Sequence, residues 1–391
     1  MMTTPSSVGL NTTFPFMSND MVSGTAGPDD DDGPQTVTLT SWLVPLIFGI
    51  ITVVGVSGNA IVCYVISRHV QMRTATNYYI MNLAITDIAF LVCCAPFTAA
   101  VYATNNWIFG RFICKFVMYM MQVTAQATCM TLTAMSIDRY QAIMRPLRSL
   151  GTRTQSGVLV VSACIWGVSA LIAIPIAVYF DVKQFEFGPV CIEDWPNKQY
   201  MYPAYGLFTV IVLYVIPLFI IVVCYVSMLR TLWRTSLPGE EEACQSQNHR
   251  RAHKQKRRVT LMVLSVVIVF AACWFPVYVV NLWFRFDPNF PKTNFMYGVK
   301  VFAHLLTYAN SCINPFVYSF MGRNFQRYFR KECACCYPCS CQSKGYTQTG
   351  GRKVMTEDRA MAHFKSGHST GNTQSTVALP LFSRSSRSSQ S

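Results

Sequence analysis

Asp87 is a carboxylate within an uninterrupted apolar stretch that runs from Tyr78 to Tyr102. A carboxylate in hydrocarbon is costly unless polar partners or water relieve it. An ionisable residue in such a place is by default a candidate functional site. Asp87 therefore predicts a polar site inside a bundle of membrane helices.

A second group with chemical potential is the run Asp138, Arg139, Tyr140, at the end of another apolar stretch. The guanidinium of Arg139 is always charged and offers a rigid fork of donors, so it can exchange partners between two states. This run predicts an ionic switch at a membrane boundary.

A third group lies in the last apolar stretch, which contains Asn310, Ser311, Asn314, Pro315 and Tyr318. A proline inside a helix removes one backbone hydrogen bond and frees carbonyls for nearby polar side chains or water. We expect a hinge at Pro315.

These groups belong to apolar segments that are long enough to cross a membrane. Of the 391 residues, 52% are hydrophobic and 13% are charged, roughly half the charged share of a soluble chain. Seven windows of at least about 20 residues carry few charges: Trp42 to Ser67, Tyr78 to Tyr102, Phe112 to Ile137, Gly157 to Phe180, Pro203 to Leu229, Val259 to Phe284 and Tyr297 to Met321. Such windows are too long for barrel strands, so an all-α membrane protein with a seven-transmembrane helix bundle is predicted.

Basic residues in the short loops set the expected orientation, since Lys and Arg stay on the cytoplasmic side. They follow the first span (Arg68, Arg73), the third (Arg145, Arg148, Arg153) and precede the sixth (Arg250, Arg251, Lys254, Lys256, Arg257, Arg258). We therefore expect a multi-pass plasma-membrane protein with an extracellular N-terminus. Without a cleavable signal peptide, the first span would act as the insertion signal. The formal net charge of +14 suits anionic membrane lipid and an intracellular partner, and nucleic acid is not expected as a partner.

Two of the 16 cysteines stand apart once this orientation is assumed. Cys114 lies at the outer end of the third span, and Cys191 lies in the outer loop after the fourth. In that oxidising space they have only each other as partners. A disulfide would hold that loop over the mouth of the bundle. The alternative is two free thiols.

The ends of the chain differ from the bundle, which is expected over residues 42–322. Residues 1–41 are predicted to be extracellular and disordered, with a glycosylation sequon at Asn11. Residues 342–391 are predicted to be a disordered cytoplasmic tail, whose serines and threonines could take phosphate and recruit an arrestin.

Residues 323–341 are expected to form a short amphipathic eighth helix followed by a cysteine-rich lipidation segment. Phe325 and Phe329 are four residues apart among basic side chains, as in a helix that lies in the headgroups. Palmitoylation of Cys333, Cys335 and Cys336 is the first interpretation; a metal-binding knot or unmodified thiols are the alternatives.

The order of these features resembles the rhodopsin-like (class A) family of G-protein-coupled receptors. The resemblance covers the chain from about Trp42 to Cys341 and touches all seven spans: Asn59; Asn82 and Asp87; Cys114 and Asp138 to Tyr140; Trp166; Pro217 and Tyr225; Trp274 and Pro276; Asn314 to Tyr318. It implies a receptor and not an enzyme.

The resemblance implies roles for the polar groups. Asp87, Thr128, Asn310, Ser311 and Asn314 would form a pocket for water and an allosteric sodium ion, which is the sole cofactor implied. Asp138, Arg139, Tyr140, Tyr225 and Tyr318 would couple to a heterotrimeric G protein, with Trp274 as the lever under the ligand. The foot of the sixth span, Lys254 to Arg258, has no carboxylate to hold Arg139. The inactive state would then rest on Asp138 and packing, with measurable basal signalling.

The residues also limit the ligand. The turn Met120 to Val123 has no acid for an amine, and Lys300 lies only at the outer edge of the last span, unlike the deep lysine that retinal requires. A transporter would need a second buried charge or an internal repeat.

What remains is a neutral polar mouth with acids in the lid loop, which suits a peptide carrying a cation near an amidated end. The candidates are Gln122, Gln126, Trp274, Tyr278, Asn281, His304 and Tyr308, with Asp181, Glu186, Glu193 and Asp194 in the loop. Each could instead be an ordinary interhelical polar contact.

Within the family the chain is most similar to kisspeptin receptors, which group with galanin and allatostatin receptors. The similarity rests on Cys93, Cys94 and Pro96 to Ala99; Cys114 to Val117; Gln126 to Cys129; Thr131 to Ser136; Pro146 to Leu150; and Phe270 to Trp274. It implies an extracellular peptide ending in Arg-Phe-amide and coupling to phospholipase C and calcium. Glu193 or Asp194 would receive the peptide arginine, and Gln122 and His304 the amide. A galanin- or allatostatin-type receptor that couples to inhibitory G proteins, and a non-signalling scavenging receptor, are the alternatives.

Overall fold

The computed structural model describes residues 33–145, 153–186, 188–234, 247–291, 293–322 and 325–328. The chain divides into two compact units, Met1–Pro338 and Cys339–Ser391. The second unit lies wholly outside the described residues. The predicted glycosylation site Asn11, the candidate lipidation sites Cys333, Cys335 and Cys336, and the serines and threonines of the tail also lie outside them.

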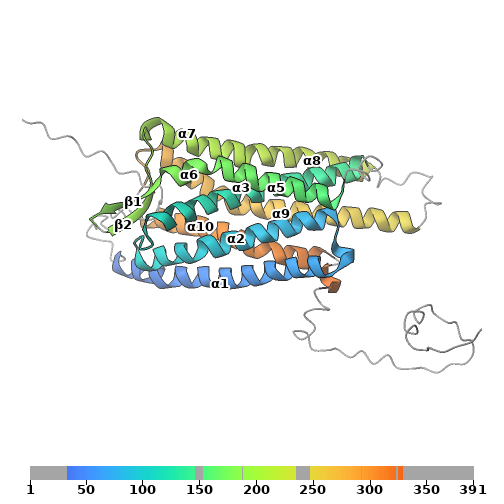
Figure 1. Cartoon of the computed structure of the whole chain (residues 1–391), viewed down its shortest axis with the longest axis horizontal. Helices are drawn as coiled ribbons and strands as arrows, with labels where there is room; N and C mark the ends of the chain where they lie inside the picture. The colour runs from blue at the N-terminus through green and yellow to red at the C-terminus, as the bar shows by residue number, and fades with distance from the viewer. Residues whose placement is uncertain are drawn as a thin grey trace, which may run out of the picture. The chain divides into compact units, whose positions relative to one another are not determined.

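Long helices lie side by side in the first unit (Figure 1). They are α1 (Gly33–Arg68), α2 (Ala75–Thr104), α3 (Gly110–Met144), α5 (Gln155–Ile172) with α6 (Ile174–Tyr179), α7 (Lys198–Val210) with η3 (Ile211–Val215) and α8 (Ile216–Arg234), α9 (Gln247–Phe286) and α10 (Asn294–Met321), and a short 3-10 turn, η2 (Val70–Met72), follows α1. α3 contacts α2, α5, α8 and α9, while α10 joins α9 to α1. Two strands, β1 (Phe180–Phe185) and β2 (Gly188–Glu193), lie at one end of the bundle, the lid end; the opposite end is called the far end.

Five of these helical segments are long and apolar enough to cross a membrane: Ser41–Arg68, Ala75–Thr104, Gln155–Tyr179, Lys198–Thr231 and Lys254–Phe286. The other two predicted spans, α3 and α10, carry more polar residues. In α3 these include the buried Thr124, Gln126, Thr131 and Ser136. A helix covered by its neighbours on most sides does not need an apolar surface all round, because its polar side chains face protein.

The helices differ from the predicted windows at several boundaries and, in the fourth and fifth windows, in their interior. α1 begins at Gly33, within the segment expected to be disordered, and Pro34 suits a first turn because that position needs no backbone donor. The fourth window divides at Ala173, and Pro175 lies in the first turn of α6 for the same reason. The fifth contains η3, a π-helical turn, where the Tyr214 hydroxyl donates to the carbonyl of Ala271 in α9 at 2.7 Å.

The lid loop is a β-hairpin, so the all-α prediction is incomplete. β1 and β2 are antiparallel, with Val182 opposite Cys191. Gly188, at the turn, has φ +124° and Asn106 packed against it, so a side chain there would be both strained and obstructed.

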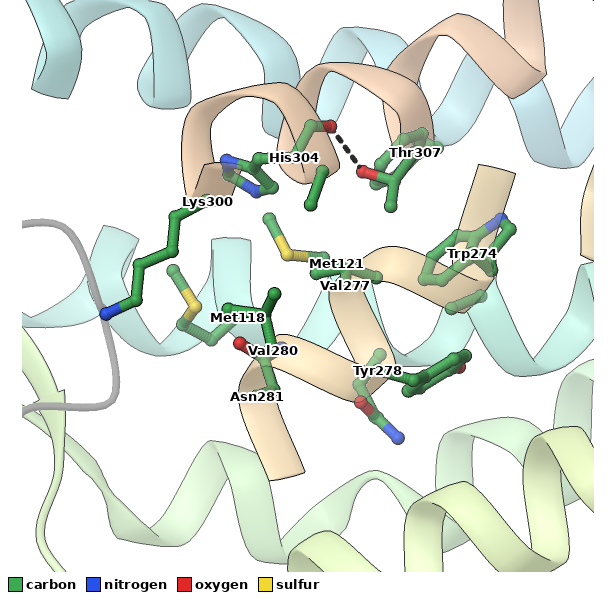
Figure 2. A pocket seen from close by; sticks show the side chains of 14 residues that line it. Met118, Met121, Trp274, Val277, Tyr278, Val280, Asn281, Lys300, His304 and Thr307 are labelled. Carbon is green, nitrogen blue, oxygen red and sulfur yellow. Dashed lines mark hydrogen bonds between the residues drawn. The ribbon is translucent and has the colours of Figure 1, made fainter. Parts of the chain in front are cut away.

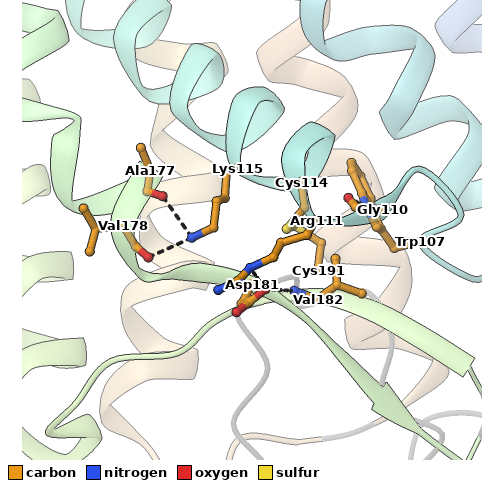
Figure 3. Close-up of a disulfide and its surroundings, with 10 residues drawn as sticks. All are labelled: Trp107, Gly110, Arg111, Cys114, Lys115, Ala177, Val178, Asp181, Val182 and Cys191. Carbon is orange, nitrogen blue, oxygen red and sulfur yellow. Dashed lines mark hydrogen bonds and ion pairs between the residues drawn. A yellow bond between two sulfur atoms is a disulfide. The ribbon is translucent and has the colours of Figure 1, made fainter.

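A disulfide joins Cys114 of α3 to Cys191 of β2, with Cα atoms 5.7 Å apart (Figure 3). This confirms the predicted pairing. Lys115 supports the same junction by donating to the carbonyls of Ala177 and Val178 at 3.1 and 2.8 Å. The hairpin is thus fixed to the lid end of α3 by one covalent bond and by polar contacts.

At Gly55, α1 packs closely against α2 and α10. A Cβ at Gly55 would lie 2.5 Å from Leu91 Cδ1 and 3.5 Å from the Cα of Cys312. Outward-facing apolar side chains, by contrast, are exposed, as for Phe219 (69%) and Phe320 (72%). Large apolar surfaces of this kind suit a lipid environment.

Four residues of the predicted eighth helix are described, and 325–328 are helical. Phe325 is buried near Tyr318, whereas Arg327 is exposed. Tyr328 stacks on His69 with ring centroids 4.1 Å apart and donates to Gln71. This turn thus has a buried and an exposed side, and the amphipathic eighth helix as a whole stays a prediction.

Candidate functional site

A cavity of about 180 Å³ lies between α2, α3, α9 and α10. Five predicted ligand-binding residues line it: Gln122, Trp274, Tyr278, Asn281 and His304. Figure 2 shows Trp274, Tyr278 and Asn281 arranged along successive turns of α9, with His304 across the cavity on α10. These spacings place the side chains on one face of each helix.

Two other predicted ligand-binding residues lie outside the lining. Tyr308 is fully buried, shares a 2.8 Å hydrogen bond with Thr98 and stacks on Phe90. Gln126 is buried, and neither atom of its side-chain amide has a hydrogen-bond partner among the described residues. Tyr308 supports the cavity from behind, while Gln126 retains unused donors and an acceptor within the bundle.

The cavity also contains residues that the sequence did not single out, including Met118, Met121 and Lys300. Lys300 is buried, and its ammonium lies 4.3 Å and 4.6 Å from the ring centroids of Phe284 and Phe290. Such distances fit cation–π interactions. The signal that could have found Lys300 is its spacing, four residues before His304 on the same face of α10.

Glu193 and Asp194, the lid acids expected to receive the peptide arginine, have different surroundings. Asp194 is partly exposed and pairs with Lys183 at 2.7 Å and Lys198 at 3.3 Å. The hydrogen bond from Lys183 holds the pKa of the Asp194 carboxyl below its ordinary value. Exposed pairs of this kind exchange at little cost.

Glu193 is buried and forms a bidentate pair with Arg285 of α9. Arg285 Nη2 donates to Glu193 Oε1 at 2.7 Å, and Nη1 donates to Oε2 at 3.1 Å. Trp195 Nε1 donates to the same Oε2 at 2.6 Å. Arg285 was not predicted as a site residue, because a cation at the end of an apolar span indicates a membrane boundary.

Asp87 lies in a buried polar network between α2 and α10. Asn314 Nδ2 donates to Asp87 Oδ2 at 2.8 Å, and Asn59 Nδ2 donates to the carbonyl of Ser311 at 2.8 Å. The Oδ1 atoms of Asn59, Asn310 and Asn314 are buried without a partner among the described residues. Ser311 and Thr128 are also buried. The carboxylate, amide and hydroxyl oxygens of these side chains are the kind of ligand that a hard monovalent cation prefers, with water completing its coordination.

The far end of α3 holds a three-membered ionic group. Arg139 Nη2 donates to Asp138 Oδ2 at 2.6 Å, while Arg153 donates from Nε to Oδ1 at 2.6 Å and from Nη2 to Oδ2 at 2.8 Å. Arg153 Nη2 also lies 3.5 Å from the Thr76 hydroxyl of α2. Tyr140 is half-buried, and Tyr225 and Tyr318 are buried in the adjacent core. Sequence reasoning assigned Arg153 to a loop and missed this contact.

The sequence comparisons identify the class of protein. Residues 58–318 match the model of the 7 transmembrane receptor (rhodopsin family). The chain belongs to this family, and is therefore a membrane receptor and not an enzyme.

Particular relatives agree with the resemblance seen in the sequence. The chain is 43% identical to G-protein coupled receptor 54 of Oreochromis niloticus, over 78% of this chain and 81% of that receptor. It is 40% identical to the KiSS-1 receptor of Mus musculus, over 86% of each chain. It is 38% identical to galanin receptor type 2 of Rattus norvegicus, over 75% of this chain and 76% of that receptor.

Proposed function

We propose that this chain is a plasma-membrane receptor for an amidated neuropeptide of the Arg-Phe-amide type. All seven long helical segments cross the membrane, and the lid end and N-terminus face the outside. Binding at the lid end activates a heterotrimeric G protein at the far end, and thereby phospholipase C and calcium release. Arrestin then binds the phosphorylated tail.

The observation that carries this proposal is the character of the cavity lining. Its polar members are the neutral Gln122, Tyr278, Asn281, His304 and Thr307 with one cation, Lys300, and no carboxylate occurs among the described lining residues. Neutral donors and acceptors suit a carboxamide, whereas an ammonium or guanidinium at this depth would meet the charge of Lys300. The amide end therefore occupies the cavity near Gln122 and His304, and the peptide arginine stays outward at a lid acid.

The far end supplies the output in this proposal. Arg139 leaves Asp138 to meet the G protein, with Tyr140, Tyr225 and Tyr318 around it, when α9 moves outward. A sodium ion at Asp87, Thr128, Asn310, Ser311 and Asn314 favours the inactive packing, and the orphaned asparagine oxygens support its presence. A ligand acts on this equilibrium only through its different affinity for the two arrangements.

Expressing the full chain in cells and applying amidated peptides tests the proposal. We expect peptides ending in Arg-Phe-amide to release calcium, with cyclic AMP recorded in parallel. Substituting Glu193→Ala together with Asp194→Ala should raise the half-maximal concentration by about tenfold or more, because the peptide cation loses its counter-charge. Asp181→Ala, in the same hairpin, is the matched control. An unchanged dose curve at equal surface expression refutes the lid-acid pairing.

The galanin receptor relative supports a second ligand class. A galanin- or allatostatin-type receptor would lower cyclic AMP through inhibitory G proteins and respond to those peptides instead. A scavenging receptor would internalise peptide without nucleotide exchange on any G protein. The same cells distinguish all three outcomes.

A further inference from the structure

The buried pair of Glu193 and Arg285 is the most elaborate polar contact at the lid end. The guanidinium of Arg285 meets Glu193 through two hydrogen bonds, donates to the carbonyl of Tyr202 at 2.9 Å, and lies 4.0 Å from the centroid of the Tyr202 ring. Trp195 completes the coordination of the carboxylate. A carboxylate, a carbonyl and an aromatic face together form a complete binding site for a guanidinium.

The fold makes room for this guanidinium. Gly206 of α7 lies beside it, and a Cβ there would be 2.5 Å from Arg285 Cδ and 2.8 Å from Nε. The side chains of Arg285 and Glu193 are only 11% and 3% exposed. The site is therefore built into the junction of β2, α7 and α9, unlike the pair between Asp181 of the hairpin and Arg111 of α3, whose arginine side chain is 69% exposed.

The position of the site connects it with the cavity. Arg285 lies four residues after Asn281, which lines the cavity, so the two occupy the same face of α9 one turn apart. A ligand that fills the cavity and extends outward along α9 reaches this turn next. Asp194, the next residue along the chain, pairs instead with two exposed lysines, Lys183 and Lys198.

We propose that Arg285 is an internal occupant of a guanidinium site, and that an arginine side chain of the ligand takes its place on Glu193. Removing either partner of a buried ion pair leaves a charge uncompensated, which is costly. Exchanging one guanidinium for another keeps the carboxylate paired throughout and avoids that cost. The exchange also releases the tie between α9 and the hairpin. This inference rests on the proposed function only in taking the ligand to be a peptide.

The proposal makes Arg285 a competitor of the ligand. Full-length wild type and Arg285→Gln are compared with an Arg-Phe-amide peptide and with its citrulline analogue, which has the same shape but no charge. Arg285→Gln should lower the half-maximal concentration of the arginine peptide by about tenfold and leave the citrulline peptide unimproved. Arg111→Gln, which breaks the exposed pair, should change neither. If Arg285→Gln weakens both peptides equally, the pair is only a structural tie and the proposal is wrong.

A second arm does not need an active peptide. Purified Arg285→Ala receptor is heated with and without propylguanidinium, and Glu193→Gln/Arg285→Ala serves as the control because it lacks the carboxylate. We expect the compound to raise the unfolding temperature of the single variant only. Equal shifts in both variants, or none, contradict a guanidinium site at Glu193. Failure of every amidated peptide on wild type, with a positive result in this arm, would refute the proposed function alone.

Discussion

Asp87 has one amide donor, Asn314, and stands among buried amide oxygens that have no donor of their own. At the scale of single residues, this excess of acceptors is the main electrostatic feature of the bundle interior. Water can satisfy some of these oxygens, and a cation can satisfy several at once. The site is therefore sensitive to the loss of one negative charge.

Replacing Asp87 with Asn should abolish the effect of sodium on agonist binding. In wild type, exchanging choline chloride for sodium chloride is expected to weaken agonist affinity by roughly fivefold or more, the lower range of ordinary coupling between sites. The variant removes the charge and keeps the shape. Radioligand competition measures the shift, and Asp287→Asn, at a half-buried acid of the lid end, is the control. A sodium effect that persists in Asp87→Asn contradicts the ion site.

Most residues of the candidate site could be predicted because each is a polar group that interrupts an apolar stretch. Trp274, Tyr278, Asn281 and His304 do line one cavity. Long basic side chains could not be predicted in the same way. Three such residues stand at the ends of apolar windows, where a charge indicates a membrane boundary: Lys300, Arg285 and Arg153. Only tertiary packing determines whether such a side chain turns inward.

At the scale of elements, Asp138 connects α3 to the start of α5 as well as to its own neighbour Arg139. Two guanidinium groups share this carboxylate. Because Arg153 remains as a partner, Asp138 does not become an unpaired buried charge when Arg139 moves away. The arrangement lowers the cost of releasing Arg139, which without Arg153 would be about 3–5 kcal/mol.

Substitutions at Asp138 and at its second partner, Arg153, should therefore have opposite effects on the release of Arg139. Asp138→Asn frees Arg139 and should raise basal signalling severalfold. Arg153→Gln leaves Arg139 as the main counter-charge of Asp138 and should lower basal signalling to half or less. Basal inositol phosphate accumulation per surface receptor measures both. Arg73→Gln, at an exposed far-end arginine, controls for general loss of charge, and a rise in Arg153→Gln would overturn this account.

Hydropathy predicted where the helices lie but not how they are interrupted. A window average responds to composition, while the break at Ala173, the π-helical turn at 211–215 and the β-hairpin depend on which backbone groups pair. Pro175 was a usable local signal for the first of these. The strands were not predicted, because a window average does not register the pairing of two short segments.

At the scale of the whole molecule, the disulfide between Cys114 and Cys191 closes a segment of 77 residues. It holds the hairpin, and with it Glu193, against the lid end of α3. Cross-linking residues so far apart restricts the unfolded chain considerably. Both the stability of the bundle and the position of the lid acids depend on this bond.

Replacing Cys114 and Cys191 with Ser should reduce stability and ligand response together. We expect a loss of about 2–5 kcal/mol, as for other native disulfides, seen as a lower unfolding temperature in detergent and fewer receptors at the cell surface. Cys164→Ser, at an exposed free cysteine, is the matched control. Unfolding at the wild-type temperature would show that the bond has no part in holding the bundle together.

The close contact of α1 with α2 and α10 at Gly55 bears on what stabilises a helix bundle in a membrane. Lipid tails are as apolar as the outer surfaces of the helices, so burying more apolar surface between helices stabilises the bundle little. The helices are held together mainly by close van der Waals packing. A methyl group added at Gly55 would lie 2.5 Å from Leu91 Cδ1, so the Leu91 side chain would have to shift to restore the fit, whereas trimming an outward-facing ring such as Phe320 would open no gap between helices. Tolerance to substitution is therefore expected to follow the fit between helices more than the apolar area of the outer surface.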